Sequence, residues 1–204
     1  MSGSSHVQFR LRVDADIVNV TVATNAHSGW YWRQVGRLAN PLIPEDKAFS
    51  EGRYHKKGGE PVWYGATCEM GAWSEHERHS SVDSQYVARF MTWVHVRDIS
   101  ILDLTDSGVL AECAIADPQQ LRSDDYSLTQ EISRATFAQD SLDGILAPSA
   151  ALPGHSILIL RRNVLYDGTG RVTEHGRKVC RPPSQFEEIR QQISKRDEPS
   201  VLAT

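Results

Sequence analysis

Apolar and polar residues alternate along residues 6–22, the first patterned segment of the chain. The apolar positions form two groups with a spacing of two residues, Val7, Phe9, Leu11 and Val13, then Val18, Val20 and Val22. Because successive side chains of a β-strand point to opposite faces, this spacing predicts one or two half-buried strands. We expect these strands to open the sheet of the domain.

A short strand followed by a helix is predicted on either side of Thr67. Residues 61–66 read Pro-Val-Trp-Tyr-Gly-Ala and favour a strand, and Thr67 stands where a helix cap belongs. In a helix over residues 68–79, positions three and four residues apart share a face. One such face carries two small residues and a carboxylate and leaves room for a ligand: Gly71, Ala72 and Glu75.

The remaining patterns complete an α/β (α+β) domain. Residues 40–59 combine Asn-Pro, Ile-Pro and Gly-Gly pairs with several charges, which indicates an irregular connection. Strand-like runs follow at residues 90–104, as two runs, and at 144–148 and 156–160. An amphipathic helix is expected over residues 124–139, capped by Asp124 or Ser123, and a polar helix over 185–195 before a frayed tail.

Composition narrows the class of protein. A chain of 204 residues is long enough for one domain with a substantial core. The 22 basic and 26 acidic residues leave a net charge of −4, too mild to favour nucleic acid or membrane as a partner. Cys68, Cys113 and Cys180 are odd in number and far apart, which disfavours a disulfide scaffold or a zinc site. No secretion signal or membrane anchor is indicated, and we expect a cytoplasmic protein.

Four short segments carry side chains that are suited to a binding site. They are Trp30-Tyr31-Trp32-Arg33, Gly52-Arg53-Tyr54-His55, the helical Glu75, and Pro148-Ser149-Ala150. Aromatic rings and a guanidinium suit a phosphorylated ligand, and a serine at the end of a strand lies where α/β sites form. Taken singly, each segment also fits a structural role: an edge strand, a hairpin, a solvated glutamate and a turn.

In this order, the segments resemble the RES domain, a family named for an Arg, a Glu and a Ser. The family has an aromatic-Arg pair, a Gly-Arg-aromatic-Asn-like turn, a Gly-x-Pro-Val-x-Tyr strand, an Ala-x-x-Glu helix and a late Pro-Ser-Ala. The counterparts here are Tyr31-Trp32-Arg33, Gly52-Arg53-Tyr54-His55, Gly59-Glu60-Pro61-Val62-Trp63-Tyr64, Ala72-Trp73-Ser74-Glu75 and Pro148-Ser149-Ala150. His55 replaces the frequent Asn, residues 80–140 fit loosely, and residues 167–204 have no counterpart.

The resemblance implies a fold similar to ADP-ribosyltransferases, with a mixed, largely antiparallel sheet flanked by helices. It implies cleavage of the nicotinamide–ribose bond of NAD⁺ by hydrolysis or phosphorolysis, with NAD⁺ as substrate, inorganic phosphate as a candidate second substrate, and no cofactor or metal. Many RES proteins are toxins of bacterial toxin–antitoxin pairs, which implies a cognate antitoxin and, through it, a homo-oligomer. The expected parts are an N-terminal strand region (1–29), the NAD-cleaving core (30–165) and a C-terminal extension (166–204).

The resemblance also implies roles for single residues. Departure of nicotinamide creates an oxocarbenium-like ribosyl cation, which Glu75 is expected to stabilise. Arg33 is expected to hold the pyrophosphate, with help from Arg53. Ser149 is expected to position the substrate and not to act as a nucleophile, because no Gly-x-Ser-x-Gly elbow surrounds it. The remaining predicted NAD-binding residues are Tyr64, Tyr54, Tyr31 and His55.

Other functions compete with NAD⁺ cleavage. A metal enzyme is disfavoured because His76 and His79 are three residues apart and do not form His-Glu-x-x-His. A Rossmann dehydrogenase is disfavoured because the chain has no Gly-x-Gly-x-x-Gly between a strand and a helix. Two alternatives stay open: a transferase that passes ADP-ribose to a protein, and a non-catalytic module that binds a nucleotide or a partner.

Overall fold

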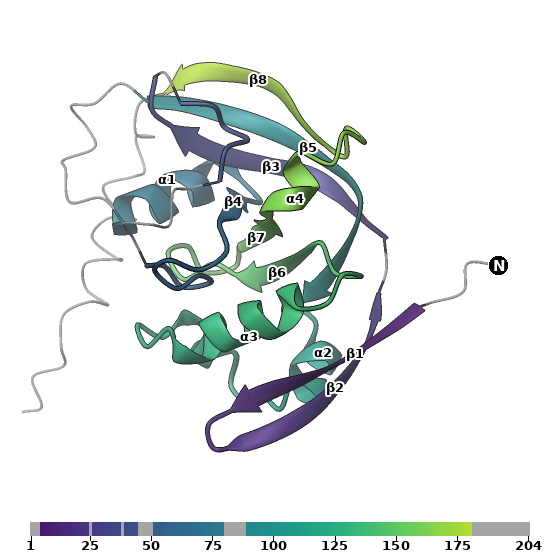
Figure 1. The fold of residues 1–204 in the computed structure, drawn as a ribbon. Helices are drawn as coiled ribbons and strands as arrows, with labels where there is room; N and C mark the ends of the chain where they lie inside the picture. The colour runs from purple at the N-terminus through teal and green to yellow at the C-terminus, as the bar shows by residue number, and fades with distance from the viewer. Residues whose placement is uncertain (1–4, 25, 38, 45–50, 80–88, 181–204) are drawn as a thin grey trace, which may run out of the picture.

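One long strand, β5 (Arg89–Asp103), connects the two parts of the main sheet. The computed structural model describes residues 5–24, 26–37, 39–44, 51–79 and 89–180 (Figure 1). β5 pairs antiparallel with β3 (Ala26–Val35) and β8 (Val172–Cys180), and its last residues pair parallel with β6 (Gly144–Pro148). The prediction of two separate strand runs at 90–104 is therefore wrong.

A β-bulge explains why the pattern of β5 is interrupted. Arg97 and Asp98 break the alternation, but they lie where the register with β3 shifts, opposite Ser28. Asp98 has a φ of 49° and its backbone N–H donates to Ser28 Oγ at 3.0 Å. The one extra residue of β5 is thus absorbed within a continuous strand, as β-bulges generally allow.

The main sheet has six strands in the order β3-β4-β7-β6-β5-β8, with a further pairing between β3 and β5. β4 (Val62–Ala66) and β7 (Ser156–Arg161) pair at five positions, as do β6 and β7. β3 and β4 pair only at Trp32 and Ala66. The two strands therefore diverge from a single contact, and a cleft opens between them.

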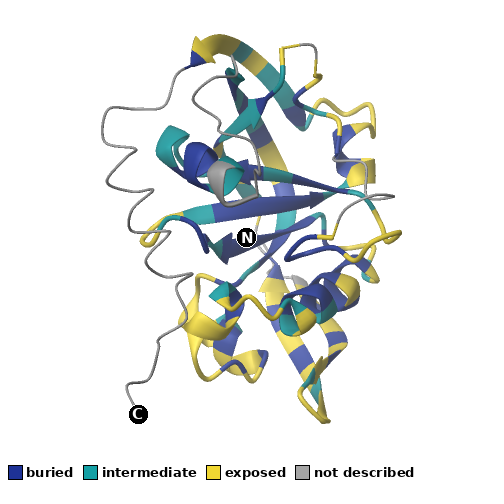
Figure 2. Ribbon diagram, turned by 90° about the vertical axis from the view of Figure 1, so that its left-hand side faces the viewer, coloured by how far each residue is buried: buried dark blue, intermediate teal, exposed yellow. Residues whose placement is uncertain are grey.

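The N-terminal alternation does form two strands, β1 (Ser5–Val13) and β2 (Asp16–Thr24). Contrary to expectation, they do not open the main sheet but form a separate two-stranded sheet. The hairpin packs on α3 (Ser127–Phe137) and α2 (Ser107–Glu112), and its alternating buried and exposed residues are visible at the bottom of Figure 2. Its apolar face is covered by helices, so pairing with the sheet is not needed to bury it.

Three further helical segments complete the described fold. α1 (Glu69–His79) packs against β3 and β4, the short 3₁₀ helix η2 (Pro118–Arg122) precedes α3, and α4 (Arg162–Leu165) directly continues β7. The predicted helices at 68–79 and 124–139 and strands at 144–148 and 156–160 are confirmed. The predicted helix at 185–195 lies outside the described residues.

The predicted helix caps are wrong. The Thr67 hydroxyl donates to the Ser156 carbonyl at 3.1 Å and so ties the start of α1 to β7, while Cys68 Sγ accepts the Gly71 N–H at 3.2 Å. For α3, the cap position is Tyr126, which makes no side-chain cap bond; neither Asp124 nor Ser123 serves. At α1 a tertiary bond to β7 therefore engages the hydroxyl that the local pattern assigned to the cap.

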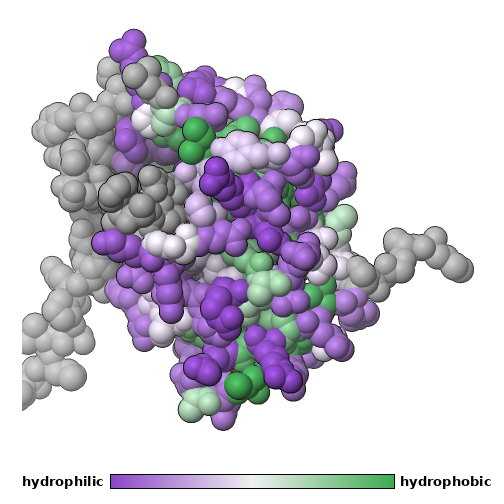
Figure 3. All heavy atoms as spheres, viewed as in Figure 1, coloured by the Kyte–Doolittle hydropathy of each residue, from purple (hydrophilic) through white to green (hydrophobic). Residues whose placement is uncertain are grey.

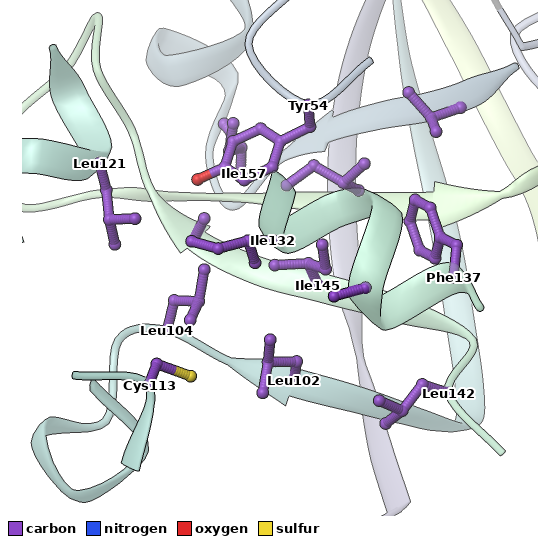
Figure 4. Packing of buried hydrophobic residues seen from close by; sticks show 14 of the residues in the cluster. Tyr54, Leu102, Leu104, Cys113, Leu121, Ile132, Phe137, Leu142, Ile145 and Ile157 are labelled. Carbon is purple, nitrogen blue, oxygen red and sulfur yellow. The ribbon is translucent and has the colours of Figure 1, made fainter. Parts of the chain in front are cut away.

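Two apolar clusters lie on opposite faces of the main sheet, and β4 contributes to both. Val62 and Ala66 belong to the larger cluster and Trp63 to the smaller one, as expected for side chains that alternate along a strand. The larger cluster joins the sheet to α3 and to the hairpin, and Figure 4 shows Ile132 of α3 within it. On the face seen in Figure 3, hydrophobic groups are small and are separated by hydrophilic ones.

The predicted C-terminal extension from residue 166 begins inside the fold, because β8 pairs with β5 along eight positions. Strand β8 is thus an edge strand of the main sheet (Figure 1). Within the described ranges, no helix combines the length and apolar composition that crossing a bilayer requires.

Ile132→Ala is predicted to destabilise the fold, because the side chain is fully buried in the larger cluster. Removing it should lower the free energy of unfolding by about 2–5 kcal/mol. The matched control is Ile17→Ala on β2, where the side chain is 60% exposed and the change should stay within about 0.5 kcal/mol. Urea unfolding followed by circular dichroism measures both, and equal losses would contradict this description of the core.

Candidate active site

A cavity of about 400 Å³ lies in the cleft where β3 and β4 diverge. Its walls come from β3, residues 51–55, β4 and α1. A volume between about 300 and 1,000 Å³ is typical of small-ligand sites. Small residues on two walls make room for a ligand, Gly65 and Ala66 on β4 and Ala72 on α1.

Glu75 and Ser149 meet beside this cavity although 74 residues separate them. Glu75 lies on α1 and lines the cavity, and Ser149 follows directly after β6. Ser149 Oγ donates its proton to Glu75 Oε1 at 2.6 Å and accepts the Leu152 N–H at 2.9 Å. Because both sides of the hydroxyl are engaged, Ser149 fixes the orientation of the carboxylate.

The loop that carries Ser149 is closed by its own backbone. Ser149 N–H donates to the His155 carbonyl at 2.8 Å, and His155 N–H donates to the Leu152 carbonyl at 3.3 Å. Ser149 is 1% exposed and does not line the cavity. Its hydroxyl therefore acts on a ligand only indirectly, by holding the Glu75 carboxylate. The sequence, in contrast, suggests a direct bond from Ser149 to the substrate.

A tight turn at residues 52–55 forms the wall opposite α1. Gly52 and His55 form an isolated antiparallel bridge, and His55 Nδ1 lies 2.8 Å from the hydroxyl of Tyr64 on β4. The same hydroxyl accepts the Tyr54 N–H at 3.2 Å. A Cβ on Gly52 would lie 2.1 Å from the His55 ring, so only glycine leaves space for this arrangement.

Two polar residues of α3 form hydrogen bonds with backbone carbonyls of this turn. Thr129 Oγ1 donates to the Arg53 carbonyl at 2.6 Å, and Gln130 Nε2 donates to the Gly52 carbonyl at 3.1 Å. Both residues are buried, and sequence reasoning did not single them out. The sequence did contain a signal for them, because Thr129 and Gln130 are polar residues close to Ile132 on the face of an amphipathic helix that should be buried.

Arg53 lines the cavity, but its guanidinium is engaged on the far side of the turn. Nη1 donates to the carbonyls of Leu121, at 3.3 Å, and Ser123. The guanidinium carbon lies 4.7 Å from the centroid of the Tyr126 ring, and Nη2 lies 3.9 Å from Asp124. Nη1 therefore ties the turn to the segment before α3, whereas Nη2 is buried and has no hydrogen-bond partner among the described residues.

Tyr54 and Tyr31, both predicted to bind NAD⁺, lie outside the cavity. Tyr54 is fully buried in the larger cluster, where Figure 4 shows its ring near Leu121 and Ile157. Tyr31 belongs to the smaller cluster, and its hydroxyl lies 2.5 Å from His27 Nε2. Burial raises the pKa of both phenols, so each stays protonated. Their rings support the sheet and the turn.

Arg33 does line the cavity, next to the single contact of β3 with β4. Its guanidinium carbon lies 5.7 Å from the centroid of the Trp63 ring, within the range of a cation–π contact. The Thr92 hydroxyl donates to the Arg33 carbonyl at 2.8 Å and fixes this part of β3 on β5. The structure thus brings together five predicted residues along the walls: Arg33, Arg53, His55, Tyr64 and Glu75.

Sequence reasoning missed three polar residues that also line the cavity: Gln34, Glu51 and His76. Gln34 follows Arg33 on β3, and His76 follows Glu75 on α1. Among the described residues, no group of three or more His, Cys, Asp or Glu side chains is arranged to hold a metal ion.

Comparison with known proteins decides the family. The family model described as RES domain matches residues 9–174, most of the chain. The chain belongs to the RES domain family. The match begins in β1 and ends in β8, so it extends on both sides of the predicted core, residues 30–165.

One curated RES relative is a Mycobacterium tuberculosis protein named "Probable NAD(+) phosphorylase Rv3189". It is 42% identical over 130 residues, which cover 62% of this chain and 61% of the relative. This chain thus matches only about three fifths of that relative's length.

A solved structure with the same fold is that of the M. tuberculosis MbcT-MbcA toxin-antitoxin complex. The TM-score is 0.68 at 21% sequence identity, with 82% of this chain and 92% of that chain covered. It supports the RES fold assigned here: a mixed, largely antiparallel sheet with flanking helices.

Gly52→Ala is predicted to disrupt the turn of this RES domain, because the added Cβ would overlap the His55 ring. Displacing that ring breaks its contact with Tyr64 and should lower the free energy of unfolding by about 1–3 kcal/mol. The control is Gly36→Ala, whose Cβ would meet nothing within 4 Å. Urea unfolding gives the stability, and NMR of the His55 imidazole reports the contact; an unchanged His55 signal in Gly52→Ala would refute the overlap.

Proposed function

We propose that this chain is a cytoplasmic enzyme that cleaves the bond between nicotinamide and ribose in NAD⁺. The observation that carries the proposal is the Glu75 carboxylate, oriented by the Ser149 hydroxyl at the wall of a cavity that also holds Arg33. Membership of the RES domain family and the name of the curated relative support the same reaction.

In the proposed reaction the N-glycosidic bond breaks, and its electron pair leaves with nicotinamide as the neutral amide. The ribose carbon becomes oxocarbenium-like, and the negative charge of Glu75 stabilises this cation without forming a bond to it. Water then adds to the same carbon and loses a proton to solvent, which gives ADP-ribose, or inorganic phosphate adds through an anionic oxygen, which gives ADP-ribose 1″-phosphate. The reaction needs no cofactor, since NAD⁺ is consumed as a substrate.

The other lining residues divide the remaining tasks. Arg33 binds the pyrophosphate of NAD⁺, because its planar guanidinium suits two phosphoryl oxygens. Tyr64, fixed by His55 and by the Tyr54 N–H, offers a ring edge and a hydroxyl to the nicotinamide riboside. Ser149 acts as a positioning residue through Glu75.

A cognate antitoxin that covers the cavity is the proposed partner, and a homo-oligomer assembled through that antitoxin is the proposed complex. The similar solved structure is that of a toxin–antitoxin complex, which supports this assignment for a RES chain of the same fold.

Purified protein mixed with NAD⁺ is predicted to release nicotinamide, and Glu75→Gln is predicted to slow the release by at least about 100-fold. Chromatography of nicotinamide with and without inorganic phosphate separates phosphorolysis from hydrolysis. The control is Glu112→Gln, which makes the same change at an exposed position of α2 and should leave the rate unchanged.

Labelled NAD⁺ offered with a bacterial lysate separates this function from a transferase, since transfer leaves label on protein. Binding of NAD⁺ without release of nicotinamide would instead favour the non-catalytic module. Release by Glu75→Gln at the wild-type rate would refute the proposed mechanism.

Ser149→Ala is predicted to lower kcat by about 10- to 100-fold with little change in KM, since it frees Glu75 from its fixed orientation. In the Glu75→Gln background the same substitution should cause little further loss, because the two residues act as one unit. Ser141→Ala, at an exposed position before β6, is the control. Losses that simply multiply in the double variant would contradict a positioning role.

A further inference from the structure

Two residues without a role so far, Gln34 and His76, share one arginine. Both line the cavity, and the Arg89 side chain at the start of β5 contacts both. Arg89 Nε donates to Gln34 Oε1 at 3.2 Å, and Arg89 Nη2 lies 3.0 Å from His76 Nδ1. Gln34 pairs with Met91 in the sheet, so Arg89 and Gln34 are diagonal neighbours on one face.

Arg89 determines where the protons of its two partners lie. A guanidinium has donors only, so the amide atom of Gln34 that faces it must be the oxygen. For the same reason His76 Nδ1 must accept, which places the ring proton on Nε2 and makes the imidazole neutral. The N–H groups that point away from Arg89 are therefore those of the Gln34 amide and of His76 Nε2.

The amide nitrogen of Gln34, Nε2, is buried, and none of the residues described by the structure accepts a hydrogen bond from it. A buried donor left without an acceptor is unfavourable, and such groups in native structures call for an explanation. An acceptor supplied by a ligand in the adjacent cavity would satisfy it.

Arg89 adds a positive charge next to Gln34 and His76. The group is half-buried, and burial lowers its pKa. No carboxylate within the described ranges forms an ion pair with it, whereas Arg134, Arg171 and Arg177 each have one. A half-buried cation of this kind favours an anionic ligand nearby.

We propose that Gln34 and His76, held by Arg89, form a subsite for the oxygens of a phosphoryl group. The subsite presents only donors and a positive charge, which suits an anion. The carboxamide of nicotinamide fits less well, because its NH₂ group would need an acceptor that these residues do not present. Arg33, the residue before Gln34, adds a further cation at the same wall.

The identity of the ligand that carries this phosphoryl group depends on the proposed function. It is either inorganic phosphate, as the second substrate of phosphorolysis, or the pyrophosphate of the dinucleotide. The chemistry that Gln34 and His76 recognise is the same in both cases, so the experiment distinguishes the two sources.

The test begins with NAD-free protein and the side-chain amide signal of Gln34 in ¹H–¹⁵N NMR, assigned by its loss in Gln34→Glu. This variant keeps an oxygen toward Arg89 but replaces the free donor by a negative charge. Titration with inorganic phosphate is expected to shift the signal if the subsite takes free phosphate, and titration with ADP-ribose if it takes pyrophosphate. Neither ligand shifting the signal beyond sodium chloride at equal ionic strength would overturn the proposal.

Kinetics gives the second readout. Gln34→Glu is expected to raise the KM for the matching ligand, phosphate or NAD⁺, by at least about tenfold. Gln8→Glu introduces the same charge at an exposed position of β1 and should leave both KM values unchanged. If the signal shifts but no nicotinamide is released, the subsite stands and the proposed reaction fails. If nicotinamide is released while both KM values stay at wild type, the subsite fails alone.

Two variants of His76 test the proton assignment. Glutamine places an amide near the position of Nε2, and asparagine places one near Nδ1. His76→Gln is therefore expected to bind phosphate or ADP-ribose within about threefold of wild type, and His76→Asn at least about tenfold more weakly. The reverse order would show that the contact with Arg89, and not a donor toward the ligand, is what His76 provides.

Discussion

The site depends on how β3 is held in the sheet. β3 pairs with β5 at nine positions but with β4 at only one, Trp32 and Ala66. β4 in turn is held by β7 at five positions. Each strand is thus fixed by its other neighbour, and the two can diverge without either one losing its place. The cavity of about 400 Å³ is the space that this divergence leaves.

That opening brings together segments that are distant in the chain. Arg33 comes from β3, Tyr64 from β4, and Glu75 from the helix that packs on both strands. Ser149 arrives from the end of β6 and joins Glu75 by a 2.6 Å hydrogen bond. The bond restricts a carboxylate that would otherwise sample several rotamers on the surface of α1, and a fixed charge is worth more to a transition state than a mobile one.

Local pattern was enough to predict that α1 and α3 are helices and that β6 and β7 are short strands, because their periodicity is set by near neighbours. The continuity of β5 was not predictable in this way, since the bulge at Asp98 is stabilised by Ser28, 70 residues away. The separate hairpin sheet was missed for a similar reason: alternation reports that a face is buried, but not what covers it.

The candidate site shows the same division. The order of motifs pointed to Arg33, Glu75 and Ser149, and the structure places all three in or beside the cavity. The order of motifs could not show that backbone carbonyls engage the Arg53 guanidinium or that Tyr54 belongs to the core, because both depend on the segment before α3. Gln34 and His76 were not predicted to bind a ligand together because their significance comes from Arg89, which no sequence spacing connects to them.

The two proposals together give the cavity a polarity. Glu75 supplies negative charge on α1, whereas Arg33 supplies positive charge on β3, with Arg89 behind Gln34. NAD⁺ has the same separation, with a positive charge on nicotinamide and negative charges on the pyrophosphate. The two proposals therefore orient NAD⁺ with the reacting ribose carbon toward Glu75 and the pyrophosphate toward Arg33. When nicotinamide leaves, the positive charge moves onto the ribose and so toward the carboxylate, which strengthens that interaction in the transition state.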